Sequence, residues 1–95
     1  MANVIIKMRI MPESIDVQVD KLKTDVLKEI KKFCGREDDK DYRVEITPVA
    51  FGLKAVDVTF VNDEKKGGTD PLEDLLRNTE GVGGVEVLEV KRAMG

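Results

Sequence analysis

Residues able to carry out acid–base or nucleophilic chemistry are few in this 95-residue chain. Histidine, the side chain whose ordinary pKa lies nearest to neutral pH, does not occur. The one cysteine, Cys34, follows Phe33 at a predicted helix end, and the sequence supplies no neighbouring base that would activate its thiol. We therefore interpret Cys34 as a small, partly buried spacer and expect neither an internal disulfide nor a mixed Cys/His zinc site.

The other candidate chemical groups also favour structural roles. Glu86 and Glu89 lie three residues apart on a predicted strand, so their carboxylates are expected on opposite faces of a sheet. Gly67-Gly68-Thr69 precedes a helix start but lacks the Gly-Lys-Ser or Gly-Lys-Thr ending of a phosphate-binding loop. We expect no catalytic residues, no metal site, no cofactor and no covalent enzyme chemistry.

A different kind of function is indicated by the segment Pro48-Val49-Ala50-Phe51-Gly52-Leu53, which joins two strand-like runs. Such connections are normally polar, yet this one carries Phe51. In one interpretation Phe51 folds back over the sheet edge and completes the core, with Gly52 supplying a positive φ for the turn. In the other, Phe51 is an apolar anchor that inserts into a partner.

The elements that must position these residues follow from hydrophobic spacing. The predicted order is a strand over 4–11, a helix over 17–33, a hairpin, a helix beginning at Asp70, and a strand over 85–91. In the hairpin, apolar residues alternate with polar ones along both strands: Tyr42, Val44 and Ile46 on the first, and Val56, Val58 and Phe60 on the second. Asp16 and Asp70 are expected to cap the two helices, and Gly35 and Gly81 to end them. Leu72, Leu75 and Leu76 form the predicted apolar stripe of the second helix.

This order predicts an α+β fold: a ferredoxin-like βαββαβ two-layer sandwich, with both helices on one face of a four-stranded antiparallel sheet. The opposite face is then open and carries Ile5, Met11 and Ala55. An open face that is partly apolar is a candidate docking surface. The alternative function is therefore a ferredoxin-like interaction module that assembles through this face.

Composition limits the choice of function. A chain with 41% hydrophobic and 37% charged residues predicts one folded domain over residues 1–95, and a net charge of -3 argues against direct nucleic-acid binding. No stretch approaches the ~18 apolar residues of a membrane span, and no signal pattern opens the chain, so the expected location is the cytoplasm.

Two functions known for this fold are disfavoured by particular residues. A phosphatase of the acylphosphatase type needs an arginine after the first strand, where Met11-Pro12-Glu13-Ser14 offers an acid. An RNA-recognition module needs aromatic residues on its central strands, but the first strand has none and Phe60 is predicted to face the helices.

The last strand and the residues after it leave alternatives open. Val85 and Val87 share one face whereas Leu88 and Val90 share the other, so either both faces are apolar or a bulge shifts the alternation. The cations Lys91 and Arg92 are expected in a short tail, Val90-Lys91-Arg92-Ala93-Met94-Gly95. That tail is either an ordinary frayed terminus or a functional end.

Taken together, the chain resembles the guanine-nucleotide exchange domain family of translation elongation factor 1-beta, most closely in its small archaeal form. The resemblance covers essentially the whole chain. The matching segments are Ile10-Met11-Pro12-Glu13-Ser14, Pro48-Val49-Ala50-Phe51-Gly52-Leu53, the run from Glu64 to Asp70, and Val85-Glu86-Val87 followed by cations.

The resemblance implies a partner, elongation factor 1-alpha, the GTPase that carries aminoacyl-tRNA, whose GDP release the family accelerates. It implies that Phe51, between Ala50 and Gly52, docks in an apolar pocket of the GTPase. A lysine near the family's C-terminus reaches the magnesium and phosphate region. Matching the tails puts Arg92 at that position and Lys91 beside it, with Met94 following; arginine there departs from the eukaryotic pattern. The free protein is expected to be a monomer.

Overall fold

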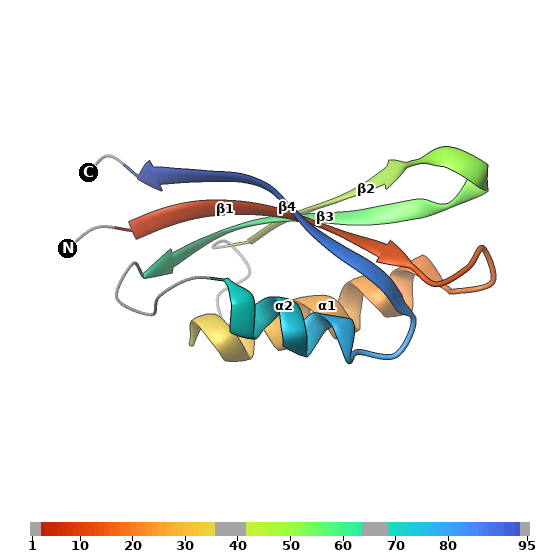
Figure 1. Cartoon of the computed structure of the whole chain (residues 1–95), viewed down its shortest axis with the longest axis horizontal. Helices are drawn as coiled ribbons and strands as arrows, with labels where there is room; N and C mark the ends of the chain where they lie inside the picture. The colour runs from red at the N-terminus through yellow and green to blue at the C-terminus, as the bar shows by residue number, and fades with distance from the viewer. Residues whose placement is uncertain (1–2, 36–41, 64–68, 94–95) are drawn as a thin grey trace.

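A computed structural model describes residues 3–35, 42–63 and 69–93 as a two-layer sandwich (Figure 1). Its elements are β1 (Asn3–Pro12), α1 (Val19–Cys34), β2 (Tyr42–Pro48), one turn of 3₁₀ helix (Ala50–Gly52), β3 (Lys54–Asp63), α2 (Asp70–Arg77) and β4 (Val82–Ala93). The antiparallel sheet has the strand order β2-β3-β1-β4, and both helices cover one face. The predicted ferredoxin-like α+β fold is therefore confirmed. Neither of the helices described is long and apolar enough to cross a membrane.

The core lies between the helices and one face of the sheet, as the alternation predicts. Ile6, Met8 and Ile10 of β1 point toward the helices and are 0–3% exposed. Phe60 lies on the same side and is buried, which confirms the orientation that disfavours an RNA-recognition surface. The remaining core residues are Leu22, Val26, Ile30, Cys34, Val56, Val58, Leu72, Leu76 and Val82. Burying this apolar surface is the main source of stability for such a small domain.

The start of α1 differs from the prediction. The helix begins at Val19, two residues later than expected, and Gln18 rather than Asp16 is the residue before it. Asp16 does not cap the helix, because the segment between β1 and α1 forms its own turn. In this turn the backbone N–H of Asp16 donates to Ser14 Oγ at 3.3 Å. The predicted end is confirmed: Gly35 adopts φ 71 and donates its N–H to the Lys31 carbonyl.

Helix α2 is shorter than the spacing suggests. Thr69, one residue before Asp70, precedes the first turn, and the helix ends at Arg77 instead of near Gly81. The Asn78 side chain donates to the Asp74 carbonyl at 2.9 Å and so occupies an acceptor at the helix end. Leu75 is 45% exposed and does not belong to the buried stripe, because a helix this short directs only Leu72 and Leu76, one turn apart, at the core.

A β-bulge in β4 decides between the two alternatives left open for the last strand. Lys7 of β1 lies opposite Glu89, whereas the next residue, Met8, lies opposite Val87, so Leu88 is the extra residue. The phase shift also places Glu86 opposite Arg9 and Glu89 opposite Lys7. Both carboxylates therefore lie on the open face, and the prediction that they point to opposite faces is wrong.

The open face is less apolar than predicted. Ala55 is fully buried, whereas we expected it to be an exposed part of this face. The Ala55 methyl group extends less far from the sheet than the side chain of Thr47, its cross-strand neighbour, so the larger neighbouring side chain shields the methyl group from solvent. Ile5 is 36% exposed and Met11 is half-buried.

A charged cluster occupies the centre of the open face. Arg9 donates from Nε and Nη2 to the two carboxylate oxygens of Asp57, at 2.9 and 3.1 Å, and Thr47 donates its hydroxyl to Asp57 Oδ2 at 2.8 Å. These three residues lie on β1, β3 and β2, so the cluster ties three strands in register. The hydrogen bonds from Arg9 and then Thr47 hold the pKa of the buried Asp57 carboxyl below its ordinary value, although burial acts in the opposite direction.

Replacing Asp57 by asparagine should therefore lower the free energy of unfolding by about 2 kcal/mol at pH 7, because charged hydrogen bonds are lost in a buried position. The carboxylate's contribution is fully present above its unfolded pKa of about 4 and is lost as the pH falls through its lower folded pKa. Urea unfolding between pH 2 and 7 should show the gap between wild type and Asp57→Asn narrowing in acid. As a control, Glu45→Gln removes the exposed Arg43–Glu45 pair and should change stability by less than about 0.5 kcal/mol. Equal stability of wild type and Asp57→Asn at pH 7 would contradict the role given to the cluster.

Candidate partner-binding site

Phe51 lies at the tip of the β2–β3 hairpin and points away from the core. Its side chain is 93% exposed, the largest value among the large apolar residues described. It is also the one non-glycine residue with a positive φ in the described ranges, at φ 62 and ψ 28. A bulky residue in this left-handed conformation is strained by about 1–2 kcal/mol relative to ordinary backbone. The interpretation that Phe51 folds back to complete the core is therefore wrong.

The hairpin tip is closed by its own backbone. Val49 donates its N–H to the Leu53 carbonyl at 2.8 Å, and Leu53 donates to the Ala50 carbonyl at 3.3 Å. Gly52, at φ 75, follows Phe51 with a second left-handed conformation. Because two successive positive φ values are needed, the turn holds the phenylalanine ring outward instead of letting it lie along the strands.

The base of the hairpin is fixed by the charged cluster on the open face. Thr47 and Pro48 of β2 lie opposite Ala55 and Lys54 of β3, directly below the tip. Through Thr47, the Arg9–Asp57 pair links this part of the hairpin to the central strand β1. The hairpin extends beyond the sheet at one end of the molecule (Figure 1).

The C-terminal cations belong to the sheet. Strand β4 continues to Ala93, two residues beyond the predicted end at Lys91, so Lys91 and Arg92 do not lie in a projecting tail. Lys91 is opposite Ile5 and Arg92 is opposite Val4, which puts them on opposite faces, as alternation predicts. Lys91 Nζ lies 3.0 Å from Glu89 Oε1, and both side chains are largely exposed. Met94 lies outside the described residues.

The structure does not bring the hairpin tip and these cations together. They lie at opposite ends of a molecule whose longest extent is 42 Å (Figure 1). Lys91 lies opposite Ile5 of β1, and Ile5 lies opposite Val61, near the C-terminal end of β3. Phe51 lies beyond the other end of β3, which begins at Lys54. Seven residues of strand alone correspond to a separation of about 23 Å. A partner that contacts both Phe51 and the cations of β4 must span at least this distance.

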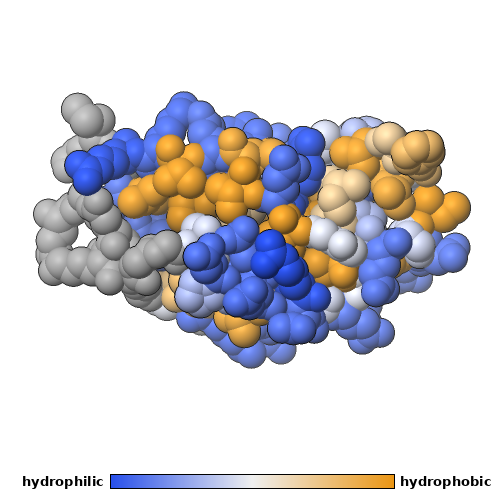
Figure 2. Space-filling model, in the orientation of Figure 1, coloured by the Kyte–Doolittle hydropathy of each residue, from blue (hydrophilic) through white to orange (hydrophobic). Residues whose placement is uncertain are grey.

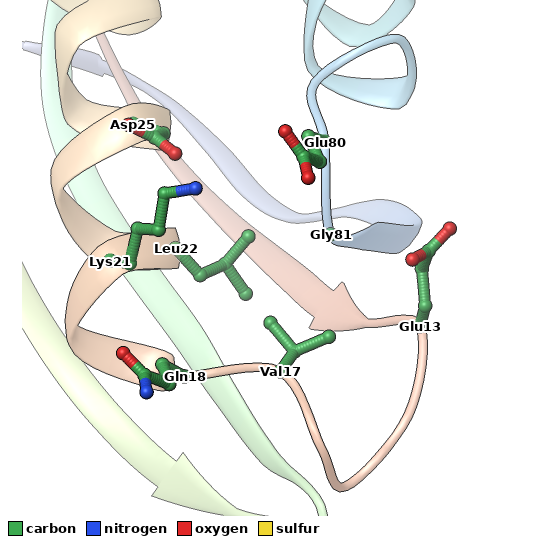
Figure 3. A pocket seen from close by; sticks show the side chains of 8 residues that line it. All are labelled: Glu13, Val17, Gln18, Lys21, Leu22, Asp25, Glu80 and Gly81. Atoms are coloured by element: carbon green, nitrogen blue, oxygen red, sulfur yellow. The ribbon is translucent and has the colours of Figure 1, made fainter.

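A pocket of about 200 Å³ with both polar and apolar lining residues lies between α1 and the turn that leads into β4 (Figure 3). Lys21 extends toward the space between Asp25 and Glu80, and Glu13 lies across from them. Among the residues that the structure describes, no group of acidic or sulfur ligands could hold a metal ion. We assign no chemistry to this pocket, which sequence reasoning did not anticipate.

A sequence profile described as the EF-1 guanine nucleotide exchange domain matches residues 5–93. The chain belongs to this family. Relatives of this exchange domain include Elongation factor 1-beta of Staphylothermus marinus, 41% identical over 93 residues, which cover 97% of this chain and 98% of that protein. Elongation factor 1-beta of Methanothermobacter thermautotrophicus is 35% identical over 94 residues, 99% of this chain and 100% of the relative.

A solved structure supports the fold of the exchange domain. The de novo designed protein Foldit4 superposes with a TM-score of 0.52 at 18% identity, and the match covers 98% of both chains. At that identity the likeness concerns the fold alone.

One exposed residue near the tip of this exchange domain was missed by sequence reasoning. Ile15 is 69% exposed in the segment between β1 and α1. The available signal was of the same kind as for Phe51: a large apolar residue between Ser14 and Asp16, in a segment where polar residues are the rule.

Proposed function

We propose that the chain acts, as one domain over residues 1–95, as a guanine-nucleotide exchange factor for the GTPase elongation factor 1-alpha. The observation that carries the proposal is the outward, strained Phe51 at the hairpin tip of a chain that belongs to the exchange-domain family. The relatives' name, Elongation factor 1-beta, supports the choice of partner. The free protein is a monomer in the cytoplasm, and exchange requires no covalent chemistry on its side chains.

Phe51 supplies docking energy in this proposal. A phenylalanine ring buries about 150–250 Å² when it enters an apolar pocket, and a buried aromatic side chain is a typical hot spot of an interface. The ring starts fully exposed and rigidly presented, so its binding needs little rearrangement of the hairpin. Ala50 and Gly52 beside it allow the partner's surface to approach closely.

The cations of β4 supply the destabilising contact at the nucleotide site. Bound guanine nucleotides are held partly by a magnesium ion that bridges phosphate oxygens. A positive charge placed beside that ion repels it and competes for its acidic ligands. Lys91 is available for this because its pair with Glu89 is on the surface, where such pairs contribute little. Arg92 occupies the position that matches the family's lysine but directs its side chain to the other face of β4.

Thermodynamic linkage determines the outcome of this binding. A factor that binds the nucleotide-free GTPase more tightly than the GDP-bound form must weaken GDP binding by the same ratio. Nucleotide binding in turn releases the factor, so the cycle runs without consumption of the factor.

The proposal is tested by the affinity of the chain for two states of purified elongation factor 1-alpha, nucleotide-free and GDP-bound. We expect the nucleotide-free form to bind at least tenfold more tightly, by calorimetry. Equal affinities would contradict exchange. The same samples on a sizing column test the alternative, an interaction module that assembles through its open face, which predicts self-association that depends on Ile5.

A further inference from the structure

Ile15 forms a second exposed apolar projection at the hairpin end of the molecule. Its side chain is 69% exposed, second only to Phe51 among the large apolar residues described. An exposed apolar side chain of this size contributes little to the core, and single exposed apolar residues are common, so the position of Ile15 relative to Phe51 is what gives it meaning.

Ile15 lies directly against the hairpin tip. A Cβ atom built on Gly52 would be 3.9 Å from Ile15 Cγ2, which is van der Waals contact distance. A hollow of about 300 Å³ lies between the two segments, and Val17, Val19 and Leu53 contribute to its lining. Apolar surface is visible at this end of the molecule in the space-filling view (Figure 2). Ile15 therefore adjoins Gly52, the residue that follows Phe51, and the two exposed apolar side chains belong to adjoining loops at one end of the molecule.

The segment that carries Ile15 is held as firmly as the hairpin tip. The Glu13 N–H donates to the Gly81 carbonyl at 2.9 Å, and the Val17 N–H donates to the Ser14 carbonyl at 3.3 Å. Ile15 lies between these two bonds, so its exposure is a property of a closed turn rather than of a loose end.

We propose that Ile15 and Phe51 dock together on one apolar surface of the partner GTPase, with basic side chains at the rim of that surface. This inference rests on the proposed function. The adjacency of Ile15 to the loop that carries Phe51 supports the choice of partner. The exposed carboxylates of Glu13 and Asp16, on the same turn as Ile15, are complementary to a basic rim.

The test uses the full chain and purified elongation factor 1-alpha loaded with a fluorescent GDP. In Ile15→Ala, the concentration of factor that gives half-maximal GDP release should rise about tenfold while the maximal release rate stays at the wild-type value, since the side chain acts in docking. Leu75→Ala removes a large apolar side chain that is 45% exposed on α2 and should leave both quantities unchanged. Thermal unfolding of both variants should match the wild type.

The outcomes separate this inference from the proposed function. If the wild type does not accelerate release, the proposed function fails and the inference fails with it. If the wild type accelerates release and Ile15→Ala has the same half-maximal concentration, the inference alone is overturned. Asp16→Lys tests the basic rim. The association rate of this variant with the GTPase should be several-fold lower than that of the wild type at low salt, and equal to it near 1 M salt, where surface charges are screened. An association rate equal to that of the wild type at low salt would contradict the proposed basic rim.

Discussion

Replacing Phe51 by glycine should make the protein slightly more stable and much weaker as a docking partner. The left-handed conformation at φ 62 costs a bulky residue about 1–2 kcal/mol, and glycine removes that cost at the expense of about 0.5–1 kcal/mol of unfolded-chain entropy. Because the ring is 93% exposed, its removal leaves no cavity. We expect the free energy of unfolding to rise by up to about 1 kcal/mol and the affinity for nucleotide-free elongation factor 1-alpha to fall about thirtyfold to a hundredfold.

Phe51→Ala is the matched control for this prediction. Alanine removes the ring but retains a Cβ atom, so the backbone strain remains. Both variants should therefore lose the same affinity, whereas only the glycine variant should unfold at a higher urea concentration. A loss of stability in Phe51→Gly similar to that of a core substitution would show that the ring has a role inside the fold. Unchanged affinity in both variants would show that the ring does not contribute to docking.

Neutralising the β4 cations should affect the rate of GDP release more than docking. In the double variant Lys91→Gln, Arg92→Gln, we expect the maximal release rate at saturating factor to fall at least tenfold, because a positive charge beside the magnesium ion is the destabilising element of the proposed mechanism. The half-maximal concentration should change much less, since the apolar anchor remains intact. The two single variants identify which cation acts.

Substitution is a better test here than truncation. Residues 91–93 pair with β1 opposite Ile5, Val4 and Asn3, so deleting them would remove sheet hydrogen bonds as well as charges. The double variant Lys23→Gln, Lys28→Gln makes the same change of net charge on exposed positions of α1 and should leave the maximal rate unchanged. If both double variants slow release equally, the effect comes from overall charge and not from the end of β4.

Much of the fold could be predicted because its periodic signals are local. The alternation of Ile6, Met8 and Ile10 identified the buried face of β1, and the glycine after Cys34 identified the end of α1. The bulge at Leu88 could be predicted only as one of two alternatives, since the extra residue is defined by its pairing with β1, which lies about 80 residues earlier in the chain. The side to which Glu86 and Glu89 point depends on that pairing.

The candidate site was predicted in type but not in geometry. An aromatic residue in a turn indicated an anchor, but only the two left-handed conformations at Phe51 and Gly52 decide that the ring points outward. The separation of Phe51 from Lys91 depends on the length of β3 and on the register of three strands, neither of which appears in local spacing. Ile15 was missed because nothing in the sequence shows that its turn packs against the hairpin tip.

The central claim is tested most directly by the rate of fluorescent GDP dissociation from elongation factor 1-alpha, measured by stopped flow with excess unlabelled nucleotide and increasing concentrations of the intact chain. The account predicts that the rate rises with the factor and reaches a plateau at least tenfold above the spontaneous rate. A dissociation rate that stays at the spontaneous value at saturating factor would contradict it.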